Sequence, residues 1–504
     1  MASYLLRREH ILLDLGYSVI RDKEGSAKVQ TKQKKVLPYV EFGISTSMGC
    51  KLPLYNWLAP ILLSLVNFVA LSSAQAQAQL TTQSSAQLSG QIQGPIPAAI
   101  QSVQVLHWWK SASEHKAIDV LAGRLAQENI VWHDAIIPGG SGIGAGIVLK
   151  SRILAGNAPE IAQLNGVMIS QWANLGLLLE FDTVASSGKW DKLFFPTVWE
   201  LIQPRGHLVA APLGIHRINT LFYNKKIFSK YNLAPPETWD EFESAAELLQ
   251  KKGIVPLAQS SEPWQIATLF ETLLLSESDA TFYRAAFVTK ESRAFNDLRF
   301  FRALQRLRFL KKFMQLPVQE QSWIEVTHLL ASGDAGMLVM GDWAKGELNA
   351  WGVPTDVGFA CVAVPNTANY HLYDVDTLVM LAKDNASRAS QEKVAQLAVS
   401  PLLQAEYNQI KGSISVLRNP DLSKMDSCSR SSWKMFSRGS AVQVPSLAHR
   451  MATDEISKDA IIAEIVRFFM DDTISVADTQ HRLAAISHSL PKRKAGNDAQ
   501  NTYR

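Results

Sequence analysis

Apolar and polar residues alternate along residues 103–109, which read Val-Gln-Val-Leu-His-Trp-Trp. This period of two predicts a strand that ends on the adjacent Trp108 and Trp109. Ser111 and Glu114 follow with the spacing of a capping box, and apolar residues then recur at helical intervals. The pattern therefore predicts a strand that delivers aromatic side chains to the start of a helix.

The same alternation of strand and helix continues along the chain. The pattern predicts strands over 130–137 and 159–163, and a helix over 147–155. The loop 138–146 contains five glycines but lacks the Gly-Lys-Ser or Gly-Lys-Thr ending of a phosphate-binding loop, which favours a flexible turn. Repeated strand–helix units of this kind indicate a doubly wound α/β sheet.

Two extended segments, 209–212 and 220–224, flank a stretch that contains His216 and Arg217. Such a stretch suits a crossing between two lobes. His216 and Arg217 would either contact a ligand there or orient the crossing, and the residues alone leave both open. A helix that begins after Thr238 and closing helices over 454–489 complete the expected elements.

The N-terminal part carries export signals. Residues 48–78 combine Lys51, an apolar stretch and the small residues Ala74-Gln-Ala-Gln-Ala78, which predicts a secretory signal peptide cleaved after Ala76 or Ala78. A retained membrane anchor is the alternative, because the apolar run approaches spanning length. Residues 1–47 form an uncertain extension, which either translation from Met48 or an unusually long n-region of the signal peptide would explain.

The amino-acid composition indicates a linker and a tail on either side of the folded chain, and it argues against one class of partner. Residues 79–101 predict a flexible Gln- and Ser-rich linker, and 491–504 a disordered tail. The hydrophobic share of 47% and the length of 504 residues indicate about two globular domains. Residues 1–51 hold the whole net charge of +4, with nine Lys or Arg against five Asp or Glu. The remainder is balanced, which argues against a nucleic-acid partner.

Cysteine and motif content argue against bound cofactors. Cys50, Cys361 and Cys428 are the only cysteines and lack metal-ligand spacing. No dinucleotide fingerprint, metal motif or serine nucleophile elbow is present. We therefore expect no metal and no cofactor. In an exported chain Cys361 and Cys428 could pair, although the sequence does not show whether they approach each other.

Four segments taken in order resemble one protein family. They are the strand ending in His-Trp-Trp, the Pro-Leu-Gly-Ile-His-Arg crossing, the Pro-Glu-Thr-Trp-Asp-Glu-Phe segment after residue 235, and the Gly-Asp-Trp-Ala-Lys segment at 341–345. Together with a signal peptide they are similar to the extracellular solute-binding proteins (family 1) of bacterial ABC transporters, most of all the glucose/mannose-binding branch. The resemblance covers about residues 103–490.

The resemblance implies a fold in the α/β class, the type II periplasmic-binding-protein fold. Two α/β lobes would be joined by crossing segments, with the ligand in the cleft between them. Lobe 1 would comprise residues 102–212 plus 366–415, and lobe 2 residues 213–365 plus 416–490. The same resemblance implies nine ligand-binding residues, which are Trp108, Trp109, Glu114, Asn165, Trp323, Trp343, Asp376, Lys411 and His449.

These residue types suit a hexose for independent reasons. Carboxylates such as Glu114 and Asp376 accept hydrogen bonds from neighbouring hydroxyls, Lys411 donates, and indole faces cover the C–H surface of a pyranose. Asn165 departs from the family, which commonly has a longer polar residue there, so the preferred sugar is in doubt. Asp342 is expected to cap a helix or a turn beside Trp343.

The function implied is that of a periplasmic sugar-binding component of an ABC transporter. It would be a monomer that captures a glucose- or mannose-like monosaccharide by lobe closure and delivers it to the membrane permease subunits, without being an enzyme. Two alternatives stay open. One is a secreted carbohydrate-active hydrolase that uses Glu114 and Asp376, and the other is the same fold serving as a sugar sensor for a membrane receptor.

Overall fold

The computed structural model describes residues 17–21, 27–31, 101–137, 143–383 and 386–491. The predicted signal peptide over 48–78, nearly all of the predicted linker and the tail lie outside these residues. Gln101, assigned to the linker from the sequence, is instead the first residue of a strand. In the unit that comprises residues 12–98, the described residues form an antiparallel pair of strands, β1 (Tyr17–Arg21) and β2 (Ala27–Thr31). The larger unit contains residues 99–504.

The larger unit has two sheets. The first has the strand order β12-β11-β5-β3-β4, with β6 paired to β11. Its strands are β3 (Gln101–His107), β4 (Ile130–Ile136), β5 (Ile161–Gln163), β6 (Ala210–Arg217), β11 (His371–Met380) and β12 (Gln443–Pro445). The second sheet has the order β10-β7-β9-β8. Its strands are β7 (Thr220–Asn224), β8 (Val255–Ala258), β9 (Ala335–Val339) and β10 (Phe359–Ala363).

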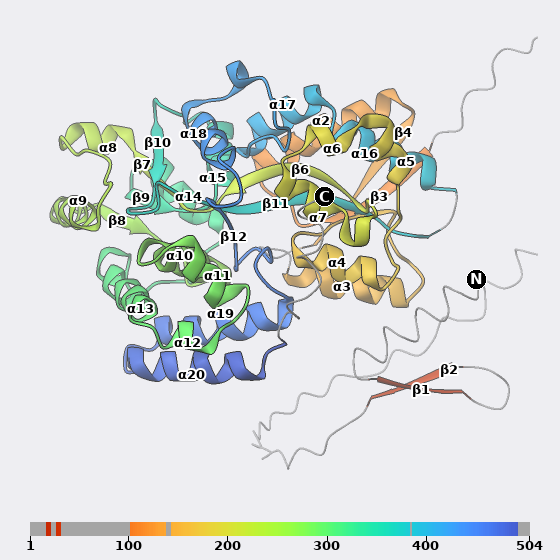
Figure 1. Ribbon diagram of the computed structural model, residues 1–504. Coiled ribbons are helices and arrows are strands. Elements are labelled where there is room, and N and C mark those ends of the chain that lie inside the picture. Colours follow the sequence, from red (N-terminus) through yellow and green to blue (C-terminus); the bar gives the residue numbers. More distant parts are fainter. Residues whose placement is uncertain (1–16, 22–26, 32–100, 138–142, 384–385, 492–504) are drawn as a thin grey trace, which may run out of the picture. The chain divides into compact units, whose positions relative to one another are not determined.

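Each sheet has its own hydrophobic core, which we call the first core and the second core. The helices α2 to α7, α16 and α17 contribute to the first core. They are α2 (Ala112–Gln127), α3 (Ile143–Leu154), α4 (Val167–Asn174), α5 (Asp182–Gly188), α6 (Trp190–Leu193), α7 (Pro196–Ile202), α16 (Arg388–Ala398) and α17 (Pro401–Lys411). Figure 1 shows these helices around β3 and β4.

The second core is built mainly from helices (Figure 1). They are α8 (Lys225–Lys230), α9 (Trp239–Lys251), α10 (Pro263–Ser276), α11 (Ala280–Phe287), α12 (Ser292–Phe295), α13 (Leu298–Leu310), α14 (Trp323–Ser332), α15 (Trp343–Ala350), α19 (Glu455–Met470) and α20 (Val476–Ser489). Helix α18 (Ser427–Phe436) contacts β10 and β11. Three short 3-10 helices complete the elements, at η2 (Pro204–Gly206), η3 (Lys311–Phe313) and η4 (Leu422–Lys424).

The chain passes between the cores at β6 and β11, which pair antiparallel. Ile215 belongs to the first core and Ile218 to the second, while Leu372 belongs to the second and Tyr373 to the first. These two paired strands are the crossing segments, and the two-lobed α/β fold is confirmed. The exact residue limits of the lobes stay a prediction.

Local sequence signals were mostly right. The capping boxes at Ser111 and Thr238 are both formed. Several expected element limits were wrong, among them the end of β3, which lies at His107 and not on the tryptophan pair. Helix α3 begins at Ile143, β5 begins at Ile161, and β6 runs unbroken to Arg217, because its pairing with β11 continues through the stretch that we expected to interrupt it.

Cys361 on β10 and Cys428 on α18 form a disulfide, with Cα atoms 5.9 Å apart. The fold thus brings together two cysteines 67 residues apart in the sequence. In the part of the chain that is described, no helix is both long enough and apolar enough to span a bilayer.

Helices α15 and α17, from different cores, touch through two glycines. A Cβ on Gly346 would lie 2.5 Å from the carbonyl oxygen of Lys411, and one on Gly412 would lie 2.3 Å from that of Asp342. Both distances are far below van der Waals contact, so only glycine fits. The backbones of the two lobes therefore meet directly at this point.

We predict that Gly412→Ala destabilises the fold much more than Gly253→Ala. Both glycines follow a helix and have positive φ, +95° and +74°, but a Cβ at Gly253 meets nothing within 4 Å. Gly253→Ala should lower the free energy of unfolding by about 1 kcal/mol through its backbone conformation. Gly412→Ala should cost at least about 2 kcal/mol more, since backbone atoms must move. Chemical denaturation measures both, and equal losses would contradict the close contact.

Candidate functional site

A pocket with about 590 Å³ of empty space, including its mouth, lies where the two cores meet. All nine residues predicted to bind ligand line it. The lining comprises Trp108, Trp109, Lys110, Glu114, Asn165, His216, Trp264, Trp323, Trp343, Asp374, Asp376, Lys411, His449 and Arg450. The first lobe supplies all three of its carboxylates, Glu114, Asp374 and Asp376, and the second core supplies three of its tryptophans.

The aromatic wall surrounds His449. The Trp343 ring lies 5.1 Å from the His449 ring and 6.2 Å from that of Trp264, measured between centroids. Trp323 and Trp343 are the first residues of α14 and α15, so these helix starts present the rings to the pocket. Trp108 is half-buried, whereas Trp109 is 1% exposed and packs in the first core. Trp108 therefore offers more of its ring to the pocket.

Glu114 links the start of α2 to the pocket. Its Oε2 accepts hydrogen bonds from the backbone N–H groups of Lys110 and Ser111, at 2.9 and 3.0 Å, and its Oε1 accepts from Lys411 Nζ at 2.9 Å. Burial alone would raise the pKa of Glu114, but the adjacent Lys411 holds it below its usual value. Burial would likewise lower the pKa of Lys411, which Glu114 and Asp376 instead raise. The two groups form a buried ion pair at neutral pH.

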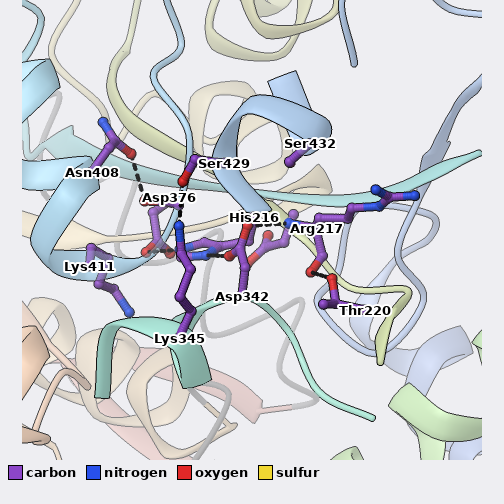
Figure 2. A network of polar contacts seen from close by, with 12 residues as sticks. His216, Arg217, Thr220, Asp342, Lys345, Asp376, Asn408, Lys411, Ser429 and Ser432 are labelled. Atoms are coloured by element: carbon purple, nitrogen blue, oxygen red, sulfur yellow. Dashed lines mark hydrogen bonds and ion pairs between the residues drawn. The ribbon is translucent and has the colours of Figure 1, made fainter. Parts of the chain in front are cut away.

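His216 lies between two aspartates, as Figure 2 shows. Its Nδ1 is 2.5 Å from Asp342 Oδ1, and its Nε2 is 3.2 Å from Asp376 Oδ2. Burial alone would lower the pKa of His216, but the two carboxylates raise it to about 9. The ring is therefore an imidazolium that donates from both nitrogens at neutral pH.

Asp342 does not cap α15, so that expectation was wrong. Its side chain makes no capping hydrogen bond. Instead Oδ1 pairs with His216 and Oδ2 accepts from the backbone N–H of Arg217 at 2.9 Å. Arg217 does not line the pocket, and its guanidinium donates to Tyr370 O and to Asn219 Oδ1. The sequence left open whether His216 and Arg217 contact a ligand or orient the crossing. In the structure His216 lines the pocket, and Arg217 orients the crossing.

Asn165 directs its amide nitrogen toward two aspartates. Its Nδ2 donates to both oxygens of Asp374, at 3.2 and 3.1 Å, and to Asp376 Oδ1 at 3.0 Å. Gln163 Nε2 donates to the same Asp376 oxygen at 3.1 Å. Asn165 Oδ1 is buried and has no hydrogen-bond partner in the described residues. The amide orientation is thus fixed by carboxylates, and its oxygen is left as an acceptor.

Asp374 and Asp376 point to the same side of β11, two residues apart. Burial and the charge of Asp376 raise the pKa of Asp374 to about 7. Burial alone would also raise the pKa of Asp376, but the hydrogen bond and charge of His216 hold it well below its usual value. Asp376 is therefore the ionised member of the pair, and Asp374 is the member that holds a proton more readily.

Sequence reasoning missed four residues of the lining and left His216 open. The four are Lys110, Trp264, Asp374 and Arg450. Asp374 had a signal, because residues two apart on a strand share a face. Trp264 had a weaker one, since it lies in the first turn of α10 as Trp323 and Trp343 do in their helices. Lys110 also had a signal, because it directly follows the tryptophan pair, whereas Arg450 had none of its own.

One group in the described residues has donor atoms close enough to hold a metal ion. Oxygen and nitrogen atoms of Glu180, Asp182 and His207 lie within 4.8 Å of one another, but all three residues are exposed and none lines the pocket. His207 Nδ1 already pairs with Asp182 at 2.9 Å. We assign no metal to this group.

We predict that Asp374→Asn stabilises the protein, more so at high pH. The folded state holds the Asp374 proton with a pKa of about 7, against an ordinary value of 3.8, so ionisation reduces the free energy of unfolding as the pH rises from about 4 through about 7. Asparagine cannot ionise. The gain should be on the order of 1–3 kcal/mol at pH 8 and smaller at pH 5. Thermal and chemical denaturation at both pH values measure it.

The matched control is Asp376→Asn, which should lower stability at pH 8, because it removes the carboxylate that compensates His216. A gain for Asp374→Asn that is equal at pH 5 and pH 8 would contradict the assigned charge state.

The sequence is similar to known proteins along most of this region. The profile of the bacterial extracellular solute-binding protein family matches residues 114–405. A probable sugar-binding periplasmic protein of Brucella suis biovar 1 (strain 1330) is 31% identical over 388 residues, covering 77% of this chain and 92% of the relative. One of Brucella melitensis biotype 1 is 32% identical over 371 residues, covering 73% and 88%.

Solved structures share the fold at low identity. The bacterial solute receptor AcbH, described as having an exclusive preference for β-D-galactopyranose, has a TM-score of 0.67 at 16% identity, covering 77% of this chain and 99% of that one. Maltose-bound MalE3 of T. maritima has a TM-score of 0.63 at 15% identity, covering 77% and 99%. The family profile spans more than half of the chain. The chain therefore belongs to the bacterial extracellular solute-binding proteins.

Proposed function

We propose that this protein is the periplasmic sugar-binding component of an ABC transporter, selective for a glucose- or mannose-like monosaccharide. One observation carries the proposal. Indole rings from both cores, three of them from the second, and carboxylate, amide and ammonium groups from the first lobe converge on a pocket of about 590 Å³. That combination matches a pyranose, which has apolar C–H faces and a rim of hydroxyls.

Closure of the two lobes is the proposed mode of capture. Glu347 on α15 accepts hydrogen bonds from the backbone N–H and Oγ of Ser113 at the start of α2, at 3.0 and 2.8 Å. Val167 N–H donates to the carbonyl of Arg450, a residue of the pocket lining, at 3.1 Å. A ligand that touches both lobes favours the state in which such contacts form. A permease that recognises this state would then receive the sugar.

The proposal also includes export of the protein from the cytoplasm. A signal peptide over 48–78 would direct the chain to the periplasm, where the protein acts as a monomer and docks on the membrane permease subunits. Relatives named as periplasmic sugar-binding proteins support this placement.

The two carboxylates considered from the sequence, Glu114 and Asp376, do not suit a hydrolase. Glycoside hydrolysis needs one carboxyl group with a raised pKa as the acid and a second carboxylate opposite it. Glu114 and Asp376, the pair considered from the sequence, both have lowered pKa values and are both held by cationic partners. Neither is placed to give up a proton to a leaving group at neutral pH.

We predict saturable binding of a hexose without turnover. Tryptophan emission is followed while purified protein is titrated with D-glucose, D-mannose, D-galactose, D-xylose and maltose, and each mixture is assayed for product. A saturable change in tryptophan emission with glucose or mannose supports the proposal, whereas formation of a product contradicts it. If tryptophan emission changes with none of these sugars, the assignment of the ligand is wrong.

Two tryptophan variants sharpen the same measurement. Trp108→Ala should weaken binding of the preferred sugar by about 1 kcal/mol or more, because it removes a ring that lines the pocket. Trp132→Ala is the control, since Trp132 is also half-buried against the first core but does not line the pocket. Equal losses of affinity would place Trp108 outside the binding surface.

A further inference from the structure

His449 is held from behind by a buried polar chain that starts at Glu271. Glu271 on α10 is fully buried, and its Oε1 accepts a hydrogen bond from Ser446 Oγ at 2.7 Å. Its Oε2 accepts from the hydroxyl of Tyr283 at 2.7 Å and from the backbone N–H of Leu447 at 2.6 Å. Ser446 Oγ lies 2.9 Å from His449 Nδ1. The chain thus runs from α10 to the ring in the pocket.

Counting protons along this chain fixes the state of the ring. Above the pKa of about 7 to which burial raises Glu271, its carboxylate can only accept, so the single hydrogen of the Ser446 hydroxyl points to Glu271. Ser446 Oγ must then accept from His449 Nδ1, as it already does from the His449 backbone N–H at 3.2 Å. Nδ1 therefore carries the ring proton.

The ring has only this one proton at neutral pH. Burial and the positive charges of Arg450 and His216 lower the pKa of His449 to about 3, so the imidazole is neutral. The Trp343 and Trp264 rings, at 5.1 and 6.0 Å from the His449 ring, keep it in place. No described residue makes a hydrogen bond to its other nitrogen, Nε2, and His449 lines the pocket.

We infer that Glu271 and Ser446 hold His449 as the tautomer protonated on Nδ1, so that Nε2 accepts a hydrogen bond from a ligand hydroxyl. In this role Glu271 and Ser446 are positioning residues that act through His449. The inference about the ligand rests on the proposed sugar-binding function. The inference about the tautomer stands on the ligand-free protein.

The consequence for recognition is a requirement for a donor. Asn165 Oδ1 is a second unpartnered acceptor in the same lining, because its amide nitrogen is used by Asp374 and Asp376. A sugar that presents free hydroxyls to these two atoms satisfies both. A deoxy or O-methyl sugar lacks the donor at one of them and leaves a buried acceptor unpaired, which is the kind of mismatch that gives strong discrimination.

The isosteric variant Glu271→Gln tests the mechanism, since it should reverse the chain. Leu447 N–H and Tyr283 O–H require an acceptor, so the glutamine oxygen takes their side and its NH₂ group faces Ser446. Ser446 would then accept from Gln and donate to His449 Nδ1. The ring proton would move to Nε2, and the acceptor in the pocket would become a donor.

The readout is the ¹⁵N spectrum of histidine side chains in the full-length, ligand-free protein at pH 8.5, above the pKa of about 7 to which burial raises Glu271. The chain has 11 histidines, so His449→Gln identifies the signal by its loss. We expect the Nδ1–H pattern in the wild type and the Nε2–H pattern in Glu271→Gln. Tyr283→Phe is the control, because it removes a bond to the same carboxylate without touching Ser446, and it should keep the Nδ1–H pattern.

Two results would overturn the inference. One is an Nε2–H pattern in the wild type, which needs no variant to fold, and the other is an unchanged pattern in a folded Glu271→Gln protein. Sugar binding is measured in a separate experiment. If D-glucose or D-mannose binds the wild type, Glu271→Gln should weaken it about tenfold or more, and Tyr283→Phe much less. If the wild type binds neither sugar but shows the Nδ1–H pattern, the proposed function is refuted and the inference about the tautomer is retained.

Discussion

The pocket depends on one buried positive charge, the His216 imidazolium between Asp342 and Asp376. An ion without water is costly, and here two carboxylates compensate it at 2.5 and 3.2 Å. Asp342 lies at the start of α15, next to the second core, and Asp376 lies on β11 in the first sheet. Charge compensation therefore binds the two lobes at the strand that crosses between them. It also keeps Asp376 ionised, so a strong acceptor faces the pocket.

The two lobes divide the chemistry of the pocket between them. The second core provides Trp264, Trp323 and Trp343. The side built on β3, β5, β11 and α17 provides carboxylates, an amide and the ammonium group of Lys411. Each lobe alone would present only part of the site, since the second lacks the carboxylates and the first has only two of the five tryptophans. Only their contact excludes water and strengthens the polar interactions.

Local patterns predicted the local parts of this structure. The capping boxes at Ser111 and Thr238 depend on residues three apart, and both are formed. The family resemblance gave the two-lobed fold and nine residues that line the pocket. The role of Asp342 was wrong, because its partner His216 lies 126 positions earlier and the sequence shows no sign of that pairing.

The same limit applies to the chain behind His449. Glu271 and Ser446 are 175 positions apart, and a buried glutamate in an apolar helix is indistinguishable in sequence from an exposed one. Trp264 likewise joins the wall only because α10 packs beside α15's first residue. Such residues are found by packing, which the pattern of one chain does not contain.

Within five residues, helix α15 contacts four different parts of the structure. Trp343 faces the pocket, Lys345 pairs with Asp426 near the disulfide, Gly346 meets α17 and Glu347 holds α2. These directions are set by the helical repeat, so the insertion or deletion of one residue would turn everything beyond it by about 100°. All later contacts would be lost at once. The length of this helix is therefore fixed more strictly than any single residue in it, and variation in chain length must be accommodated in the loops elsewhere.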